Sequence, residues 1–114
     1  MINPCQIEIK VQPMGKDYVF IITGGAAHIG ATVTAYTDQG KIVVEGTGLP
    51  GHKELELAKE LAFQAIRDLG VTVTVIMGIH IDQATKEMIQ SIVSFVRNEM
   101  DRQIQILKKS AFLS

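Results

Sequence analysis

The hydrophobic pattern of the chain changes period at one point, near Lys53. Before it, apolar and polar residues alternate or cluster in four short segments typical of β-strands, at 6–12, 18–23, 31–37 and 41–45. After it, apolar residues recur every three or four positions over 53–69 and from about 82 to 109, as on one face of a helix. A fifth strand-like segment, 71–77, separates these stretches. The pattern predicts the order ββββαβα.

These elements have matching lengths, which restricts how they pack. A seven-residue strand spans roughly 23 Å, and a helix of about 17 residues spans roughly 25 Å, so each element crosses the molecule once. The simplest packing is a single, mainly antiparallel five-stranded sheet with both helices on one face, an α+β fold. We expect residues 1–114 to form one domain.

Several local signals set the expected boundaries. Asp38-Gln39-Gly40 predicts a tight hairpin turn, and Gly70 predicts the end of the first helix. Residues 46–51 are rich in glycine and predict an irregular connector, and Asp82 is predicted to cap the second helix. The expected apolar seam of that helix consists of Ile89, Val93, Val96, Met100, Ile104 and Leu107.

Composition excludes several classes of partner. Hydrophobic residues make up 46% of the chain and the net charge is -1, so no basic footprint for nucleic acid is present. No apolar run is long enough for a membrane span, and the first residues lack the pattern of a signal peptide. The single cysteine, Cys5, fits a reducing compartment. We therefore expect a cytoplasmic protein.

The three histidines fall in three junctions between predicted elements. His28 follows the second strand, His52 precedes the first helix, and His80 closes the fifth strand. Because consecutive elements joined by short connections run in opposite directions, all three histidines are expected at the same end of the fold. A shared site at that end is the functional prediction that the residues themselves support.

Both helix N-termini are expected at this end too, with unpaired N–H groups and partial positive charge. Together with Lys53 and the backbone of Gly24 and Gly25, they suggest a site for an anion such as a phosphate. Ordinary explanations remain open, because each glycine also fits a turn, and Asp82 fits a helix cap. The histidines also suggest a metal site, although their spacing shows no metal-binding pair.

Three motifs in order resemble a known family. They are Thr-Gly-Gly-x-x-His-Ile-Gly-Ala over 23–31, Leu-Pro-Gly-His-Lys-Glu over 49–54 and Gly-Ile-His-Ile-Asp-x-Ala-Thr over 78–85. Over about residues 17–107, the chain is similar to prenylated-flavin chaperone-like proteins, which are related to an accessory component of gallate-type decarboxylases. The resemblance extends in fold to proteasome assembly chaperone 3/4-like proteins.

The resemblance implies a non-catalytic helper that binds flavin mononucleotide, plain or prenylated, and supports maturation of a prenylated-flavin-dependent decarboxylase. The expected cofactor-binding residues, with no catalytic residue and no metal ligand among them, are Gly24, Gly25, His28, His52, Lys53, His80 and Asp82.

Two other functions stay open. One is an assembly factor that acts through protein contacts alone. Its natural surface is the sheet face away from the helices, which would carry Thr32, Thr34, Thr72 and Thr74 if Val33 and Val73 point to the core. Such a face also suits a homodimer or higher homo-oligomer. The other is a small metal-dependent enzyme that uses the cluster of His28, His52 and His80.

Overall fold

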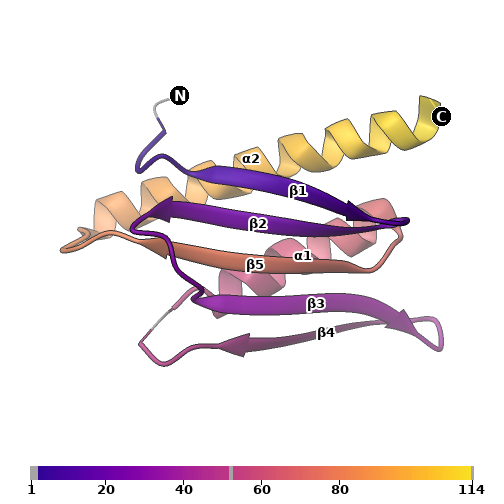
Figure 1. Cartoon of the computed structure of the whole chain (residues 1–114), viewed down its shortest axis with the longest axis horizontal. Helices are drawn as coiled ribbons and strands as arrows, with labels where there is room; N and C mark the ends of the chain where they lie inside the picture. The colour runs from indigo at the N-terminus through magenta and orange to yellow at the C-terminus, as the bar shows by residue number, and fades with distance from the viewer. Residues whose placement is uncertain (1–2, 52, 114) are drawn as a thin grey trace.

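The computed structural model describes residues 3–51 and 53–113, with side chains up to residue 110. Its elements follow the predicted order ββββαβα, and two helices lie behind a five-stranded sheet (Figure 1). They are β1 (Glu8–Met14), β2 (Asp17–Gly25), β3 (Ala31–Asp38), β4 (Lys41–Gly48), α1 (Leu55–Leu69), β5 (Val73–His80) and α2 (Lys86–Leu113).

The order of strands across the sheet is β1-β2-β5-β3-β4. β5 inserts between β2 and β3, because α1 carries the chain back along the sheet before β5 begins. β5 therefore runs parallel to β2 and antiparallel to β3, and the two outer pairs are antiparallel. The mainly antiparallel α+β prediction is confirmed, with one parallel pair that makes the sheet mixed.

The core lies between the sheet and the helices. Alternate residues of the strands face it, including Phe20, Ile22, Val33, Val73 and Val75, all with at most 1% of their surface exposed. Burial of Val33 and Val73 confirms the predicted alternation and puts Thr32, Thr34 and Thr74 on the opposite face.

One seam position was assigned wrongly. α2 buries Ile92, Val96, Met100 and Ile104 against the sheet and α1, whereas Ile89 is 50% exposed. The buried residues recur every four positions. One turn before Ile92, Met88 and Ile89 are both exposed, at 39% and 50%, so the seam that packs on the core begins at Ile92.

The glycine-rich connector begins later than predicted, because Gly46, Thr47 and Gly48 belong to β4. α1 packs closely over this part of the strand. A Cβ atom on Gly46 would lie 2.7 Å from Val33 Cγ2, and one on Gly48 would lie 3.1 Å from Leu55 Cβ. These glycines are therefore explained by close packing between helix and strand rather than by a flexible loop.

The two predicted turn signals are confirmed. Gln39 and Gly40 both have positive φ, 50° and 78°, as a type I′ hairpin turn requires, and Asp38 pairs with Lys41. Gly70 ends α1 in the left-handed conformation and donates its N–H to the carbonyl of Ile66.

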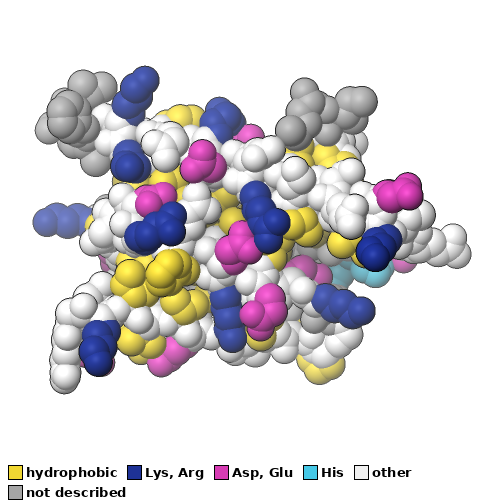
Figure 2. Space-filling view, turned by 180° about the vertical axis from the view of Figure 1, so that it is seen from behind, with side chains coloured by type: hydrophobic (Ala, Val, Ile, Leu, Met, Phe, Trp, Pro, Cys, Tyr) yellow, Lys and Arg dark blue, Asp and Glu magenta, His cyan; other side chains and the backbone are white. Residues whose placement is uncertain are grey.

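The helix face has charges of both signs interspersed with apolar side chains (Figure 2). Arg97 of α2 donates two hydrogen bonds to the Glu60 carboxylate of α1, at 2.7 and 2.8 Å. Gln64 donates to Asp101 between the same helices, at 3.2 Å. In the part of the chain that the structure describes, neither helix is long and apolar enough to cross a membrane.

Candidate functional site

His28 and His80 meet at the end of the sheet where β2 and β5 finish. Their ring centroids are 5.5 Å apart with an angle of 64° between the planes. His80 Nε2 donates to Asp82 Oδ1 at 2.9 Å, and His28 Nδ1 donates to the Ala26 carbonyl at 3.0 Å. These bonds orient both imidazoles. The prediction that these two junctions share one end of the fold is confirmed.

The segment that carries His28 crosses the end of β5. It leaves β2 after Gly25 and enters β3 at Ala31, which lies on the far side of β5 (Figure 1). A Cβ atom on Gly78 would lie 1.2 Å from the His28 carbonyl oxygen, so only glycine admits the crossing. Met77 is buried on the helix side of the sheet, so its neighbour Gly78 faces the opposite side. The crossing therefore lies on the face of the sheet away from the helices.

Backbone hydrogen bonds fasten the crossing at both ends. The N–H of Ala26 donates to the His80 carbonyl at 3.0 Å, and the N–H of Gly30 donates to the Met77 carbonyl at 2.9 Å. Gly25 has a φ of 62°, and a Cβ there would lie 2.1 Å from the His80 carbonyl oxygen. Gly25 therefore adjoins His80 directly, as the predicted site requires.

Gly24 lies against the N-terminal segment of the chain. A Cβ on Gly24 would lie 2.8 Å from Ile7 Cδ1 and 3.1 Å from Cys5 Sγ. Burial raises the pKa of the Cys5 thiol, so the thiol is protonated at neutral pH. The close approach at Gly24 is thus explained by the N-terminal segment.

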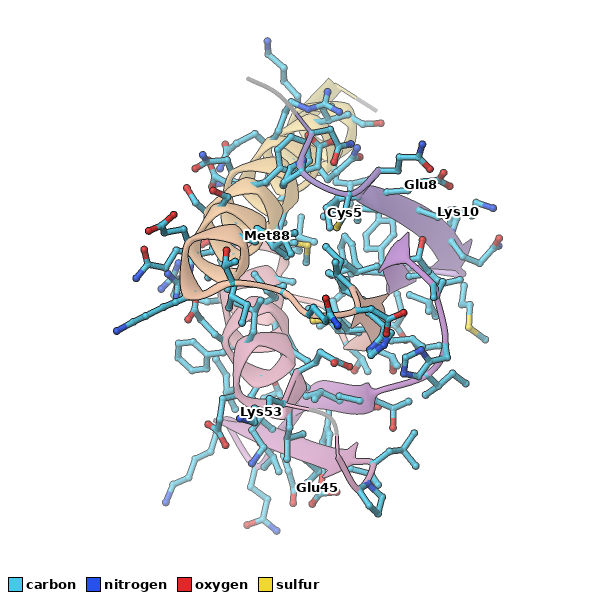
Figure 3. The ribbon with its side chains drawn as sticks, turned by 90° about the vertical axis from the view of Figure 1, so that its left-hand side faces the viewer. Cys5, Glu8, Lys10, Glu45, Lys53 and Met88 are labelled. Atoms are coloured by element: carbon cyan, nitrogen blue, oxygen red, sulfur yellow. The ribbon has the colours of Figure 1, made fainter. Side chains whose placement is uncertain are left out.

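The third junction lies at the start of α1. His52 lies outside the described residues, so its predicted place beside the other histidines stays a prediction. Lys53 is exposed near the N-terminus of α1, on the helix side of the molecule (Figure 3). The Glu54 carboxylate packs against Gly30, where a Cβ atom would overlap it. This carboxylate brings negative charge to the N-terminus of α1, where an anion was expected.

The N-terminus of α2 differs from its prediction. Asp82 was expected to cap this helix, but the helix begins only at Lys86, and Thr85 Oγ1 accepts the N–H of Met88 at 3.1 Å. Asp82 lies too far before the first turn to reach it and bonds His80 instead. The cap prediction was wrong.

A cavity of about 300 Å³ opens between β5 and the N-terminal ends of the two helices; we call it the helix-end slot. Lys53, Glu54 and His80 are the polar residues of its lining. His80 closes one wall where β5 ends, and its imidazole points toward His28 on the other face of the sheet. The rest of its lining is largely aliphatic and consists of Gly51, Leu57, Met77, Ile79, Ile81, Ala84, Ile89, Ile92 and Val93. An apolar cavity with a few polar groups is the usual form of a small-molecule site. It brings together Lys53 and His80 from two of the predicted junctions.

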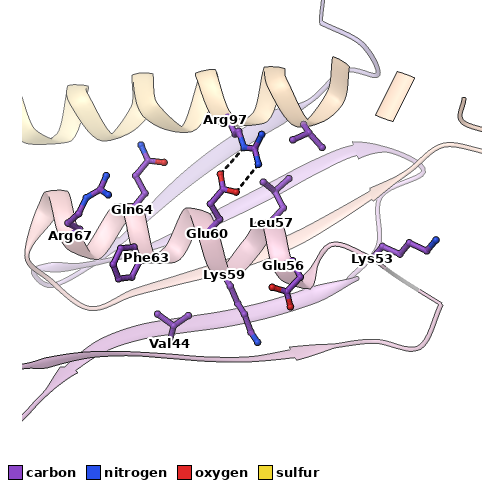
Figure 4. A pocket seen from close by; sticks show the side chains of 11 residues that line it. Val44, Lys53, Glu56, Leu57, Lys59, Glu60, Phe63, Gln64, Arg67 and Arg97 are labelled. Carbon is purple, nitrogen blue, oxygen red and sulfur yellow. Dashed lines mark hydrogen bonds and ion pairs between the residues drawn. The ribbon is translucent and has the colours of Figure 1, made fainter. Parts of the chain in front are cut away.

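A second, more open hollow of about 860 Å³ follows the outer side of α1 (Figure 4). The Glu60–Arg97 pair crosses it, and Phe63, 43% exposed, lies on its surface beneath the guanidinium of Arg67 at 5.9 Å. Of the predicted site residues, its lining includes only Lys53. Its breadth and mixed charge suit a protein surface better than a small ligand.

Among the described residues, no three His, Cys, Asp or Glu side chains gather closely enough to hold a metal ion. His80 is hydrogen-bonded to Asp82 and lies against the ring of His28, but the two histidines contact each other by their rings rather than converging on one point. The Lys53 ammonium group at the slot and the two imidazoles across the end of β5 are groups of the kind that bind phosphate.

The sequence matches the family described as the prenylated flavin chaperone LpdD-like domain over residues 2–108. The chain belongs to this family. That assignment agrees with the resemblance carried by the three junction motifs, and it covers nearly the whole chain. A search of curated proteins found no match.

Sequence reasoning missed two parts of the site. One is the contact of Glu54 with Gly30: the sequence suggests Glu54 as a first-turn acid or a further metal ligand, whereas this contact depends on how β3 and α1 pack. The other is the aliphatic lining from Ile79, Ile81 and Ala84. The alternation of Ile79, His80 and Ile81 was a signal for it, since alternate residues of a strand end face opposite sides.

Proposed function

We propose that this protein is a non-catalytic chaperone that binds flavin mononucleotide, in its prenylated or plain form, at the helix-end slot. The observation that carries the proposal is the slot itself, an aliphatic cavity with Lys53 and His80 in its lining, in a member of the prenylated flavin chaperone LpdD-like family. The family supports a chaperone role, and the slot suggests where the ligand sits.

The slot suits the apolar part of such a ligand. At about 300 Å³ it is at the small end of ligand cavities, so it holds a ring or a prenyl-derived group and leaves the ribityl phosphate outside. Its described lining includes no Phe, Tyr or Trp, so a flavin ring would be held by aliphatic contact rather than by stacking. Met77 supplies a polarisable surface for the ring.

The phosphate would be held at the mouth of the slot. Lys53 supplies a full positive charge, and His52, His80 and His28 would supply further donors at the same end of the fold. Because the Gly25 N–H already donates to the Cys5 carbonyl, Gly24 and Gly25 would offer a ligand close backbone contact around the end of β5 rather than free donors. The Glu54 carboxylate lies against Gly30 beside the start of α1, so we expect the phosphate on the side of Lys53 that faces the first turn of α2. Asp82 would act indirectly, by holding the His80 ring.

The proposed role is to support maturation of a prenylated-flavin-dependent decarboxylase, the partner that the family suggests. We assign no catalytic residue, because the chaperone needs only to bind and release the cofactor. We expect the protein to act in the cytoplasm, where the lone Cys5 stays reduced.

A thermal-shift and fluorescence titration with flavin mononucleotide, its prenylated form and inorganic phosphate tests the proposal. Saturable stabilisation by a flavin is expected and should follow ligand concentration by mass action. Lys53→Ala, His80→Ala and the double variant of His52→Ala with Lys53→Ala should each weaken binding at least tenfold, about 1.4 kcal/mol. Ala84→Leu should fill the slot and also weaken flavin binding.

Lys59→Ala is the matched control, because Lys59 is a cation on α1 that lines the outer hollow and not the slot. Its affinity for flavin should equal that of the wild type. An equal shift with phosphate alone would reduce the slot to a general anion site. No binding of either flavin would refute the cofactor role.

The second candidate is an assembly chaperone that acts through protein contacts without a small ligand. The exposed Phe63 in the broad hollow along α1 favours it. Loss of decarboxylase maturation in Phe63→Ala, with flavin affinity unchanged, would support this function over the first. Stoichiometric zinc or iron in the purified protein would instead support the metal-dependent enzyme with His28, His52 and His80.

A further inference from the structure

The two central strands carry apolar side chains on both faces of the sheet. β2 buries Phe20 and Ile22 against the helices and places Val19 and Ile21 on the opposite face, where they are half-buried. β5 places Ile76 on that same face. These strands form the parallel pair of the sheet, and parallel strands are normally covered on both faces.

The register joins these side chains into one patch. Ile21 lies beside Ile76, which lies beside Thr32, and Val19 lies in the next row beside Thr74 and Thr34. We call these six residues the open-face patch. It has no charged residue. Thr34 and Thr74 hydrogen-bond each other through their hydroxyls at 2.9 Å, so covering them leaves fewer polar groups unpaired.

Both helices lie on the other side of the sheet, and no described element covers the open-face patch (Figure 1). Charged residues stand at its two margins. Glu8 and Lys10 point away from the helices on β1, and Glu45 lies on β4 at the opposite edge of the sheet (Figure 3). The face is therefore neutral and apolar at the centre and charged at its borders, as protein interfaces are.

We propose that a second copy of this chain packs on the open-face patch, sheet against sheet, as a two-fold dimer. The whole outer face of the sheet has the open-face patch at its centre and the charged margins at its borders; five strands about 4.8 Å apart and seven residues of about 3.4 Å give it roughly 24 Å by 24 Å, or about 570 Å² on each copy. Two copies would bury roughly 1,100 Å², just above the roughly 1,000 Å² that a specific interface needs. An uncharged patch meets its own copy without like-charge repulsion.

The charges at the margins select the direction of the two-fold axis. With the axis parallel to the strands, β1 of one copy lies over β4 of the other, so the Lys10 margin faces the Glu45 margin. With the axis across the strands, β1 faces β1, and the only acid on that strand, Glu8, already lies 4.0 Å from Lys10 in its own copy. The first arrangement also puts the two helix-end slots at the same end of the dimer. This dimer does not depend on the proposed flavin function.

Sedimentation equilibrium of the full chain at micromolar concentrations tests the proposal. The wild type is expected at the dimer mass, and Ile76→Glu and Thr34→Lys are expected at the monomer mass with an unchanged circular dichroism spectrum. Thr34→Lys still tests the interface if Ile76→Glu fails to fold, because it replaces a polar side chain rather than an apolar one. Ile106→Glu, on the exposed side of α2, is the control and should remain a dimer.

A charge swap tests the axis. Lys10→Glu should weaken the dimer at least threefold, and adding Glu45→Lys should restore it; a double variant weaker than the single one would overturn this orientation. A monomeric wild type throughout the concentration range, or a fully dimeric Thr34→Lys, would overturn the proposal.

Discussion

At the scale of single residues, the glycines of the junction motifs have explanations that differ from one another. Gly78 makes room for the His28 carbonyl, Gly30 for the Glu54 carboxylate, and Gly25 for the His80 carbonyl. Each of them allows two parts of the chain to approach closely. The glycines thus build the end of the fold at which the slot opens.

Gly78→Ala should destabilise the fold by about 3 kcal/mol, because the added methyl group would overlap a backbone oxygen that cannot move aside. Gly15→Ala is the control, since a Cβ there meets nothing within 4 Å and only the positive φ of 61° costs energy, about 1 kcal/mol. Chemical denaturation measures both. Equal losses in the two variants would contradict the role assigned to Gly78.

At the scale of elements, two kinds of contact join α1 and α2. The buried seam of α2 packs on the core, and the Glu60–Arg97 pair links the helices at the surface. The hydrogen bonds from Arg97 lower the pKa of the Glu60 carboxyl below its ordinary value of 4.5. Because the folded pKa is the lower one, the pair stabilises the fold above that ordinary value and loses its effect as the pH falls through the folded pKa.

Glu60→Gln should therefore reduce the free energy of unfolding at pH 7 and have a smaller effect at acid pH, because protonation of the wild-type carboxyl removes the charge that pairs with Arg97. The effect should be small and should shrink with added salt, since both side chains are about half exposed. Urea denaturation at the two pH values measures it. Glu56→Gln removes a carboxylate from the same hollow and serves as the control. A loss that is equal at both pH values would rule out the ion pair as its cause.

At the scale of the whole molecule, α2 sets the shape. Its 28 residues extend over roughly 42 Å, which matches the longest dimension of the molecule, 42 Å. The strands are shorter, so α2 spans the full length of the sheet (Figure 1). β5 lies at the centre, with strands on both sides and α1 packed against it.

Amide hydrogen exchange should follow this arrangement. The amides of β5 and β2 should exchange most slowly, because their hydrogen bonds break only in global unfolding, and the outward amides of β1 and β4 should exchange first. Two-dimensional NMR after transfer to D₂O measures the rates. If the open-face patch is covered as proposed, dilution below the dimer dissociation constant should speed exchange in β2 and β5.

The sequence by itself determined the element order, the core-facing alternation of Val33 and Val73, the hairpin at Gln39 and Gly40, and the end of α1 at Gly70. These features depend on neighbours in the chain, through period and local φ preference. The alternating chain direction of consecutive elements also predicted correctly that His28 and His80 lie at the same end of the fold.

Tertiary structure alone decided the rest. The insertion of β5 between β2 and β3, the pairing of Asp82 with His80, the burial of Ile92 instead of Ile89 and the lining of the slot all depend on which surfaces meet. The physical reason is that periodicity shows which face of an element is apolar but not which other element covers that face.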